Sequence, residues 1–208
     1  MNVLYHMSQT LQLGDEVKPD FKGYADLAEP FVKALNYSHE TFYAMFLNAG
    51  YVGAVLAKYD LKGLPTHEIK WATEGVFEYI RRKEFPDACS RLTSTYYFDD
   101  LEKSKKLYIE DWEEMTPEER EKTKLLEMEV DGNYLEADME LFDEAFDLIW
   151  DMESPQVLEE VFELARKYFR GERSDEPEME ILSDVKAVAR KDLTDVLRQW
   201  ETELIQHT

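Results

Sequence analysis

Thr95-Tyr96-Tyr97-Phe98-Asp99-Asp100-Leu101 is a stretch that predicts a strand running directly into a helix. Residues 88–98 are dense in Thr and Tyr, which favour β-strands. The two aspartates that follow are good N-caps, because a carboxylate accepts hydrogen bonds from the free N–H groups of a first helical turn. Beyond them, Leu101, Ser104 and Tyr108 fall on one side of a helix. The stretch therefore indicates a domain that mixes strands and helices.

Outward from this stretch, the pattern of apolar residues and turn residues predicts the other elements. On the N-terminal side we expect a strand at 2–8, a helix over about 27–60 and a second helix that opens at 65–66 and ends near 85. On the C-terminal side we expect a hairpin over 125–135, helices at 139–152 and 154–170, one or two strands within 179–188, and a final helix at 194–205. Strands clustered between helical blocks in this way indicate the α+β class.

The length and charge of the chain limit its function. A chain of 208 residues suits one domain, 1–208, and no stretch reads as a linker. The formal charge of −22 repels phosphate backbones and anionic lipids, so nucleic acid and membrane surfaces are disfavoured as partners. Cys89 is the one cysteine, and the chain shows no signal peptide or apolar membrane span. We therefore expect a cytoplasmic protein.

The N-terminal strand carries the first motif, Leu4-Tyr5-His6-Met7-Ser8. It resembles the first strand of ADP-ribosyltransferases of the histidine–tyrosine–glutamate type, the branch of diphtheria toxin and poly(ADP-ribose) polymerases. The resemblance implies that His6 hydrogen-bonds a ribose hydroxyl of NAD, and that the backbone of Met7 holds the nicotinamide amide. Ser8 matches the family serine, whereas Met7 stands where the family has glycine. A core histidine at the end of a strand is the alternative interpretation of His6.

The second motif is the strand-to-helix stretch itself, which is similar to the family's Tyr-Phe-Ala-Asp turn and the helix after it. The resemblance implies that Tyr97 and Tyr108 sandwich the nicotinamide ring, and that Ser104 lies one place from a family serine. Stacking between two aromatic rings would fix the orientation of nicotinamide while its glycosidic bond lengthens. Arg91 precedes a Thr-Ser-Thr strand that resembles the arginine–serine–glutamate branch, and it is a candidate for binding the NAD diphosphate. An ordinary aromatic strand and a structural arginine are the alternatives.

Two later stretches complete the resemblance. Residues 125–134 are similar to the hairpin of the same family, and residues 178–185 to the strand that carries its catalytic glutamate. The resemblance assigns that role to Glu180, with Glu178 as the reserve because both fall on one face of a strand. A fixed carboxylate stabilises the oxocarbenium-like sugar that forms when nicotinamide leaves. It can also accept the proton of the acceptor.

Taken together, the motifs predict a single ADP-ribosyltransferase-like domain with a split β-sheet core and large helical insertions at about 23–86 and 139–176. The closest resemblance is to a bacterial or phage branch of the superfamily. The resemblance implies a mono-ADP-ribosyltransferase or NAD glycohydrolase that needs no metal. Because the chain is acidic, we expect the ADP-ribose acceptor to be a protein and not a nucleic acid. The alternative is a catalytically inactive, acidic interaction or inhibitor protein on the same fold.

Overall fold

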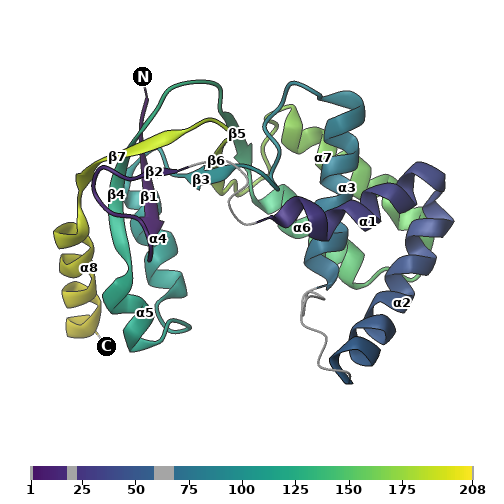
Figure 1. The fold of residues 1–208 in the computed structure, drawn as a ribbon, viewed down its shortest axis with the longest axis horizontal. Helices are drawn as coiled ribbons and strands as arrows, with labels where there is room; N and C mark the ends of the chain where they lie inside the picture. Colours follow the sequence, from purple (N-terminus) through teal and green to yellow (C-terminus); the bar gives the residue numbers. More distant parts are fainter. Residues whose placement is uncertain (1, 18–22, 59–67, 208) are drawn as a thin grey trace. The chain divides into compact units, whose positions relative to one another are not determined.

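A computed structural model describes residues 2–17, 23–58 and 68–207 of the chain. The protein is of mixed α/β class, with antiparallel sheets (Figure 1). The sequence predicts one domain, whereas the structure divides into two compact units. We call them the sheet unit (Met1–Pro19, Ser94–Tyr134 and Glu180–Thr208) and the helical unit (Asp20–Thr93 and Leu135–Met179). The segments expected as helical insertions, about 23–86 and 139–176, fall within the helical unit.

The sheet unit contains an antiparallel sheet of strands β1, β4, β7 and β2, in that order. Their bounds are β1 (Asn2–Ser8), β4 (Lys124–Val130), β7 (Ala187–Asp192) and β2 (Glu16–Val17). Further along the chain, β3 (Thr95–Tyr97) pairs antiparallel with β6 (Met179–Ser183). An isolated bridge between Tyr5 and Phe98 joins β1 to the residue after β3. The expected strand at 2–8 is therefore confirmed.

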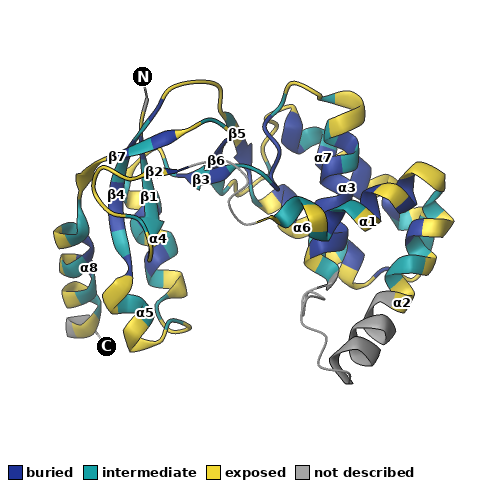
Figure 2. Cartoon of the chain, viewed as in Figure 1, coloured by how far each residue is buried: buried dark blue, intermediate teal, exposed yellow. Residues whose placement is uncertain are grey.

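Buried residues of β4 lie on both faces of the main sheet. Figure 2 colours the buried residues dark blue. Leu126 belongs to one core cluster, with Leu4, Tyr97, Met128 and Ile181 among its members. The neighbouring Leu125 belongs to a second cluster, which contains Tyr108, Leu197 and Trp200. Because adjacent side chains of a strand point to opposite faces, the two clusters lie on opposite sides of the sheet.

The helices of the sheet unit are α4 (Leu101–Asp111), α5 (Pro117–Lys122) and α8 (Thr194–His207). Asp100 is the N-cap of α4, and its carboxylate accepts the N–H of Lys103 at 2.8 Å, which confirms the expected cap. Thr116 and Glu119 form a capping box at the start of α5. Helix α4 contacts β1 and α8 contacts β4.

The hairpin expected over 125–135 does not form. Its first strand, β4, lies between β1 and β7, so both of its edges are already occupied. After β4, the chain turns at Gly132, whose φ of 154° suits glycine. A side chain at this position would also meet Val185, since a Cβ atom would lie 2.8 Å from its Cγ1. The local hairpin signal therefore marks a turn, but the partners of β4 come from distant parts of the chain.

The helical unit packs around the buried helix α3. Its elements are α1 (Tyr24–Tyr37), α2 (His39–Lys58), α3 (Glu68–Glu84), β5 (Leu135–Asp138), α6 (Glu140–Trp150), the short 3-10 helix η1 (Pro155–Val157) and α7 (Leu158–Phe169). The ring of Phe77 on α3 contacts the rings of Phe142, Tyr168 and Phe169. Gly75 allows α1 to approach closely, because a Cβ there would lie 2.6 Å from the Cβ of Phe31.

The helix expected over 27–60 differs from the structure. The single helix expected over 27–60 is interrupted at Ser38, whose extended backbone ends α1. The Ser38 hydroxyl then accepts the N–H of Thr41 at 3.1 Å, which caps the start of α2. The expected opening of the next helix at 65–66 lies outside the described residues.

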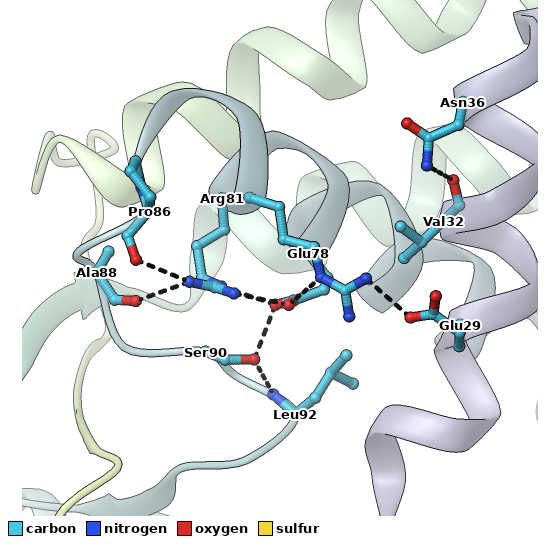
Figure 3. A network of polar contacts seen from close by, with 10 residues as sticks. Glu29, Val32, Asn36, Glu78, Arg81, Pro86, Ala88, Ser90 and Leu92 are labelled. Carbon is cyan, nitrogen blue, oxygen red and sulfur yellow. Dashed lines mark hydrogen bonds and ion pairs between the residues drawn. The ribbon is translucent and has the colours of Figure 1, made fainter.

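The strand expected over 88–98 is reduced to Thr95–Tyr97, because polar contacts hold the residues before it against α3 (Figure 3). Arg81 donates to the carbonyl oxygens of Pro86 and Ala88, at 3.3 and 3.2 Å. The hydroxyl of Ser90 donates to the carboxylate of Glu78 at 2.8 Å. Burial alone would raise the pKa of Glu78, but hydrogen bonds from Arg81, Arg82 and Ser90 hold that pKa below its ordinary value.

Candidate functional site

His6 and Tyr97, two of the residues matched to NAD-binding positions, lie side by side in the sheet unit. The bridge between Tyr5 and Phe98 sets β1 beside β3, and the two ring centroids are 5.6 Å apart. The Nδ1 atom of His6 lies 2.8 Å from the carbonyl oxygen of Tyr96, which fixes the orientation of the imidazole. His6 is half-buried, whereas Tyr97 is fully buried. Burial raises the pKa of the Tyr97 hydroxyl to about 12.

Glu180 lies on β6, the strand that pairs with β3. The register aligns Tyr97 with Ile181, so these two side chains share one face of the pair. Glu180 precedes Ile181 and its side chain therefore points to the opposite face. It is 6% exposed. The structure thus brings Glu180 next to the strand of Tyr97 but does not direct its carboxylate at the His6–Tyr97 pair.

The reserve glutamate, Glu178, lies just before β6 and is held through its backbone. Its N–H donates to the carboxylate of Asp138 at 2.9 Å, and its carbonyl oxygen accepts the N–H of Met139 at 2.8 Å. These contacts fix the segment that leads into β6.

A cavity of about 410 Å³ in the sheet unit is lined by three other predicted residues, Met7, Ser8 and Tyr108. Met7 and Ser8 end β1, and Tyr108 comes from α4. The remaining lining residues are Gln9, Asp111, Glu114, Met115, Glu119 and Thr123. Residues far apart in the sequence therefore form one cavity with apolar, aromatic and acidic walls, which we call the Tyr108 cavity.

The electrostatics of the Tyr108 cavity favour a ligand with positive charge. Burial raises the pKa of Asp111, and the nearby charge of Glu114 raises it further. Burial also raises the pKa of Tyr108, as does the carboxylate of Glu201, which accepts its hydroxyl hydrogen. Arg198 donates to the same carboxylate, so hydrogen bonds link Arg198, Glu201 and Tyr108. A cation in the cavity would relieve the repulsion between Asp111 and Glu114.

The expected sandwich of nicotinamide between Tyr97 and Tyr108 is not formed. Tyr97 packs with Leu126 in one core cluster, and Tyr108 packs with Leu125 in the other. Because these clusters lie on opposite faces of the sheet, no planar ring can lie between the two tyrosines in this arrangement. The spacing of 11 residues expected from the resemblance is present, but the alternation of β4 separates the two rings.

Arg91 is not available for the NAD diphosphate, because it is part of the core of the helical unit. Its guanidinium lies 3.2 Å from the carboxylate of Glu74, and it donates to the hydroxyl of Tyr168 at 2.6 Å. The same group lies 3.9 Å from the ring centroid of Phe142. The arginine is 7% exposed. Its role in this structure is to pair the buried Glu74 and to pack on aromatic rings.

The two predicted serines make local contacts. The hydroxyl of Ser8 accepts the N–H groups of Thr10 and Leu11, at 3.2 and 3.1 Å, and so shapes the turn after β1. Ser104 is fully buried, and its hydroxyl donates to the carbonyl oxygen of Asp100 at 3.1 Å. Ser8 lines the Tyr108 cavity, whereas the hydroxyl of Ser104 is used in a hydrogen bond to the N-cap residue of α4.

The acidic side of the Tyr108 cavity is missing from the sequence-based site. None of residues 110–122 was a candidate from the sequence, yet Asp111, Glu114, Met115 and Glu119 line the cavity. A signal was present in the spacing of Asp111, which follows Tyr108 by three positions and therefore lies on the same side of α4. Met115 lies beyond the end of that helix.

The chain also matches a model of a protein family, described as "Protein of unknown function (DUF2441)", over residues 4–194. The chain belongs to the DUF2441 family. The matched range contains all of the predicted site residues and parts of both units. A comparison of this DUF2441 protein with curated proteins gives no match.

None of the described helices has the length and apolar character that a bilayer crossing requires. Within the same described ranges, no group of three or more His, Cys, Asp or Glu side chains is arranged to hold a metal ion.

Proposed function

We propose that the sheet unit has an ADP-ribosyltransferase-like fold, binds NAD and breaks its bond to nicotinamide. The order of the residues along the strands supports the proposal. His6 lies on β1, Tyr97 on β3 and Glu180 on β6, in the order of the histidine–tyrosine–glutamate type. These three strands adjoin one another through the Tyr5–Phe98 bridge and the pairing of β3 with β6.

The lining of the Tyr108 cavity is the main support for the proposal. The cavity is lined by Met7 and Tyr108, which the resemblance assigns to nicotinamide, and by Ser8, which matches the family serine. The nicotinamide ring of NAD is a planar cation. An aromatic wall, thioether side chains and the carboxylates of Asp111 and Glu114 suit such a ring, because they combine stacking with charge attraction.

Bond cleavage requires a carboxylate beside the ribose of NAD. We assign this role to Glu180 and the orientation of the ribose to His6. Because His6 lies on the face of the sheet opposite the Tyr108 cavity, this role requires the end of β1 to rearrange when NAD binds. Since Glu180 is buried and faces away from Tyr97, turnover requires the segment around β6 to move when NAD binds. Glu180→Gln should therefore abolish nicotinamide release while NAD binding persists.

The test compares NAD with ADP-ribose, which lacks the nicotinamide cation. Binding is measured by thermal shift, since a ligand that binds only the folded protein raises its stability. We expect Asp111→Asn to weaken NAD binding about fivefold, or about 1 kcal/mol, and to leave ADP-ribose binding unchanged. Glu110→Gln is the matched control, because Glu110 is on the same helix but does not line this cavity. Absence of NAD binding at millimolar concentration would overturn the proposal.

A second candidate function is an acidic interaction or inhibitor protein on the same fold. The separation of Tyr97 and Tyr108 on opposite faces favours it, as does the burial of Arg91 in the helical unit. This candidate predicts no NAD binding at any concentration. It also predicts no ADP-ribose adduct in mass spectra of a host lysate incubated with the protein and NAD.

If NAD is split, the ADP-ribose acceptor is more readily a protein than a nucleic acid. The formal charge of −22 repels phosphate backbones and attracts basic protein surfaces. The same mass spectra identify the acceptor. We also propose that the protein acts in the cytoplasm.

A further inference from the structure

An exposed tryptophan ends helix α6 of the helical unit. Trp150 is 63% exposed, although tryptophan is among the side chains that gain most from burial. Phe146, one turn earlier, is half-buried, and the two ring centroids are 6.3 Å apart. The opposite side of α6 is anchored in the core through Leu141, Ala145 and Ile149. The two rings are therefore displayed on a helix whose other face is fixed.

The exposed side of α6 is acidic along its whole length. Exposed carboxylates recur there at helical spacing, and α6 has no basic residue. They are Glu140, Asp143, Glu144, Asp147 and Asp151. Together with Phe146 and Trp150 we call this surface the Trp150 face.

The acids of the Trp150 face act differently at the two ends of α6, since Glu140 and Asp143 lie in its first turn, where the positive end of the helix dipole favours them. Like charges three and four residues apart on a helix repel each other. Asp147 and Asp151 also lie at the C-terminal end, where the negative end of the helix dipole opposes them. On helix α7, the exposed Glu163 forms ion pairs with Arg166 and Arg170 of the same helix, whereas α6 contains no basic residue. The charge at the C-terminal end of α6 is thus unfavourable for the isolated helix.

We propose that the Trp150 face binds a basic, amphipathic segment of a partner protein. Charge complementarity selects this occupant, because Lys or Arg side chains would neutralise the carboxylates and lie over the indole ring. An apolar partner would leave the carboxylates desolvated, and a nucleic acid would be repelled. An exposed tryptophan beside charged side chains is typical of an interface anchor, because tryptophan is enriched among the residues that contribute most to binding. This inference concerns the helical unit and does not depend on NAD binding.

The test uses a synthetic helical peptide in which Lys and Leu alternate at helical spacing, with binding followed by titration calorimetry. A second peptide carries Ser in place of Leu, and therefore has the same charge without the apolar side. We expect the Lys/Leu peptide to bind about tenfold more tightly than the Lys/Ser peptide. We expect Trp150→Ala to weaken its binding by about tenfold and Trp150→Phe to weaken it less. Since Trp150 is exposed, these variants should keep the thermal stability of the parent.

Charge variants complete the test. We expect the double substitution Asp147→Asn with Asp151→Asn to weaken peptide binding about fivefold at low salt. The matched control is Glu159→Gln with Glu160→Gln, which removes the same charge from exposed positions on α7. The control should change binding less than about twofold. The proposal is overturned if the two peptides bind equally, if Trp150→Ala binds like the parent, or if the control loses as much affinity as the α6 variant.

Discussion

The sheet unit and the helical unit bury their polar groups in different ways. The helical unit buries ion pairs around α3, where Glu74 meets Arg91 and Glu78 meets Arg81. The sheet unit instead buries Tyr97 and Tyr108, whose hydroxyls are neutral and have raised pKa values. We therefore expect the two units to lose stability under opposite conditions. Acid removes the charges of the first, and alkali ionises the phenols of the second.

The largest effect is expected from breaking the buried Glu74–Arg91 ion pair, which should destabilise the helical unit and leave the sheet unit unchanged. Arg91→Met leaves Glu74 without its buried cation, and breaking such a pair costs about 3–5 kcal/mol. We expect hydrogen exchange in α3 to accelerate accordingly, while exchange in β4 is unchanged. Arg190→Met, which removes an exposed ion pair with Glu129 on β4, is the control and should have little effect. Equal acceleration in both units would contradict the division of the chain.

A smaller effect is expected at acid pH. The pKa of Glu78 is lowered in the folded state, so its contribution to stability is present above about pH 4.5 and is lost as the pH falls through the folded value. Glu78→Gln should lower the free energy of unfolding by about 2 kcal/mol at neutral pH and flatten the loss of stability in acid. The measurement is urea unfolding as a function of pH. An acid limb of unchanged steepness in the variant would remove Glu78 from the explanation.

The alkaline counterpart concerns the sheet unit. Tyr97 and Tyr108 have folded pKa values above 10, so keeping them neutral stabilises the fold below pH 10, and this stability is lost as the pH rises toward about 12 for Tyr97. Hydrogen exchange at rising pH should therefore show β4 opening before α3. The reverse order would contradict the comparison.

The smallest effect distinguishes the two tyrosines from each other. Tyr108 donates to Glu201, whereas the hydroxyl of Tyr97 is without a hydrogen-bond partner among the described residues. Tyr108→Phe should cost about 1–2 kcal/mol, and Tyr97→Phe should be close to neutral. Thermal unfolding of the two variants measures the difference. Equal losses would show that the Tyr108–Glu201 contact contributes nothing to stability.

Local features of the fold could be predicted from the sequence, and long-range features could not. The cap at Asp100 and the stop at Gly171, whose φ is 70°, depend on neighbouring residues and were predictable. The neighbours of β4 are more than 50 residues away along the chain, so a hairpin pattern next to it was misleading. The same limit applies to Arg91, whose partner Tyr168 is 77 residues away.

The candidate site shows the same division. The structure places His6 beside Tyr97, because the strands that carry them are adjacent. The face on which each side chain lies depends on strand register, and a shift by one residue reverses it. For that reason the sequence could not place Glu180 or separate Tyr108 from Tyr97. The spacing from Tyr108 indicates the side of α4 on which Asp111 lies, but the sequence could not show that Glu114, in the turn after α4, also lines a cavity.

The most direct test of the account is hydrogen exchange measured with and without NAD. We expect NAD to slow exchange at the end of β1 and along α4, around Met7 and Tyr108, and to leave α3 and α6 unchanged. The Asp111→Asn variant should show weaker protection at the same residues. Protection confined to the helical unit, or no change anywhere at saturating NAD, would contradict the assignment of NAD binding to the Tyr108 cavity.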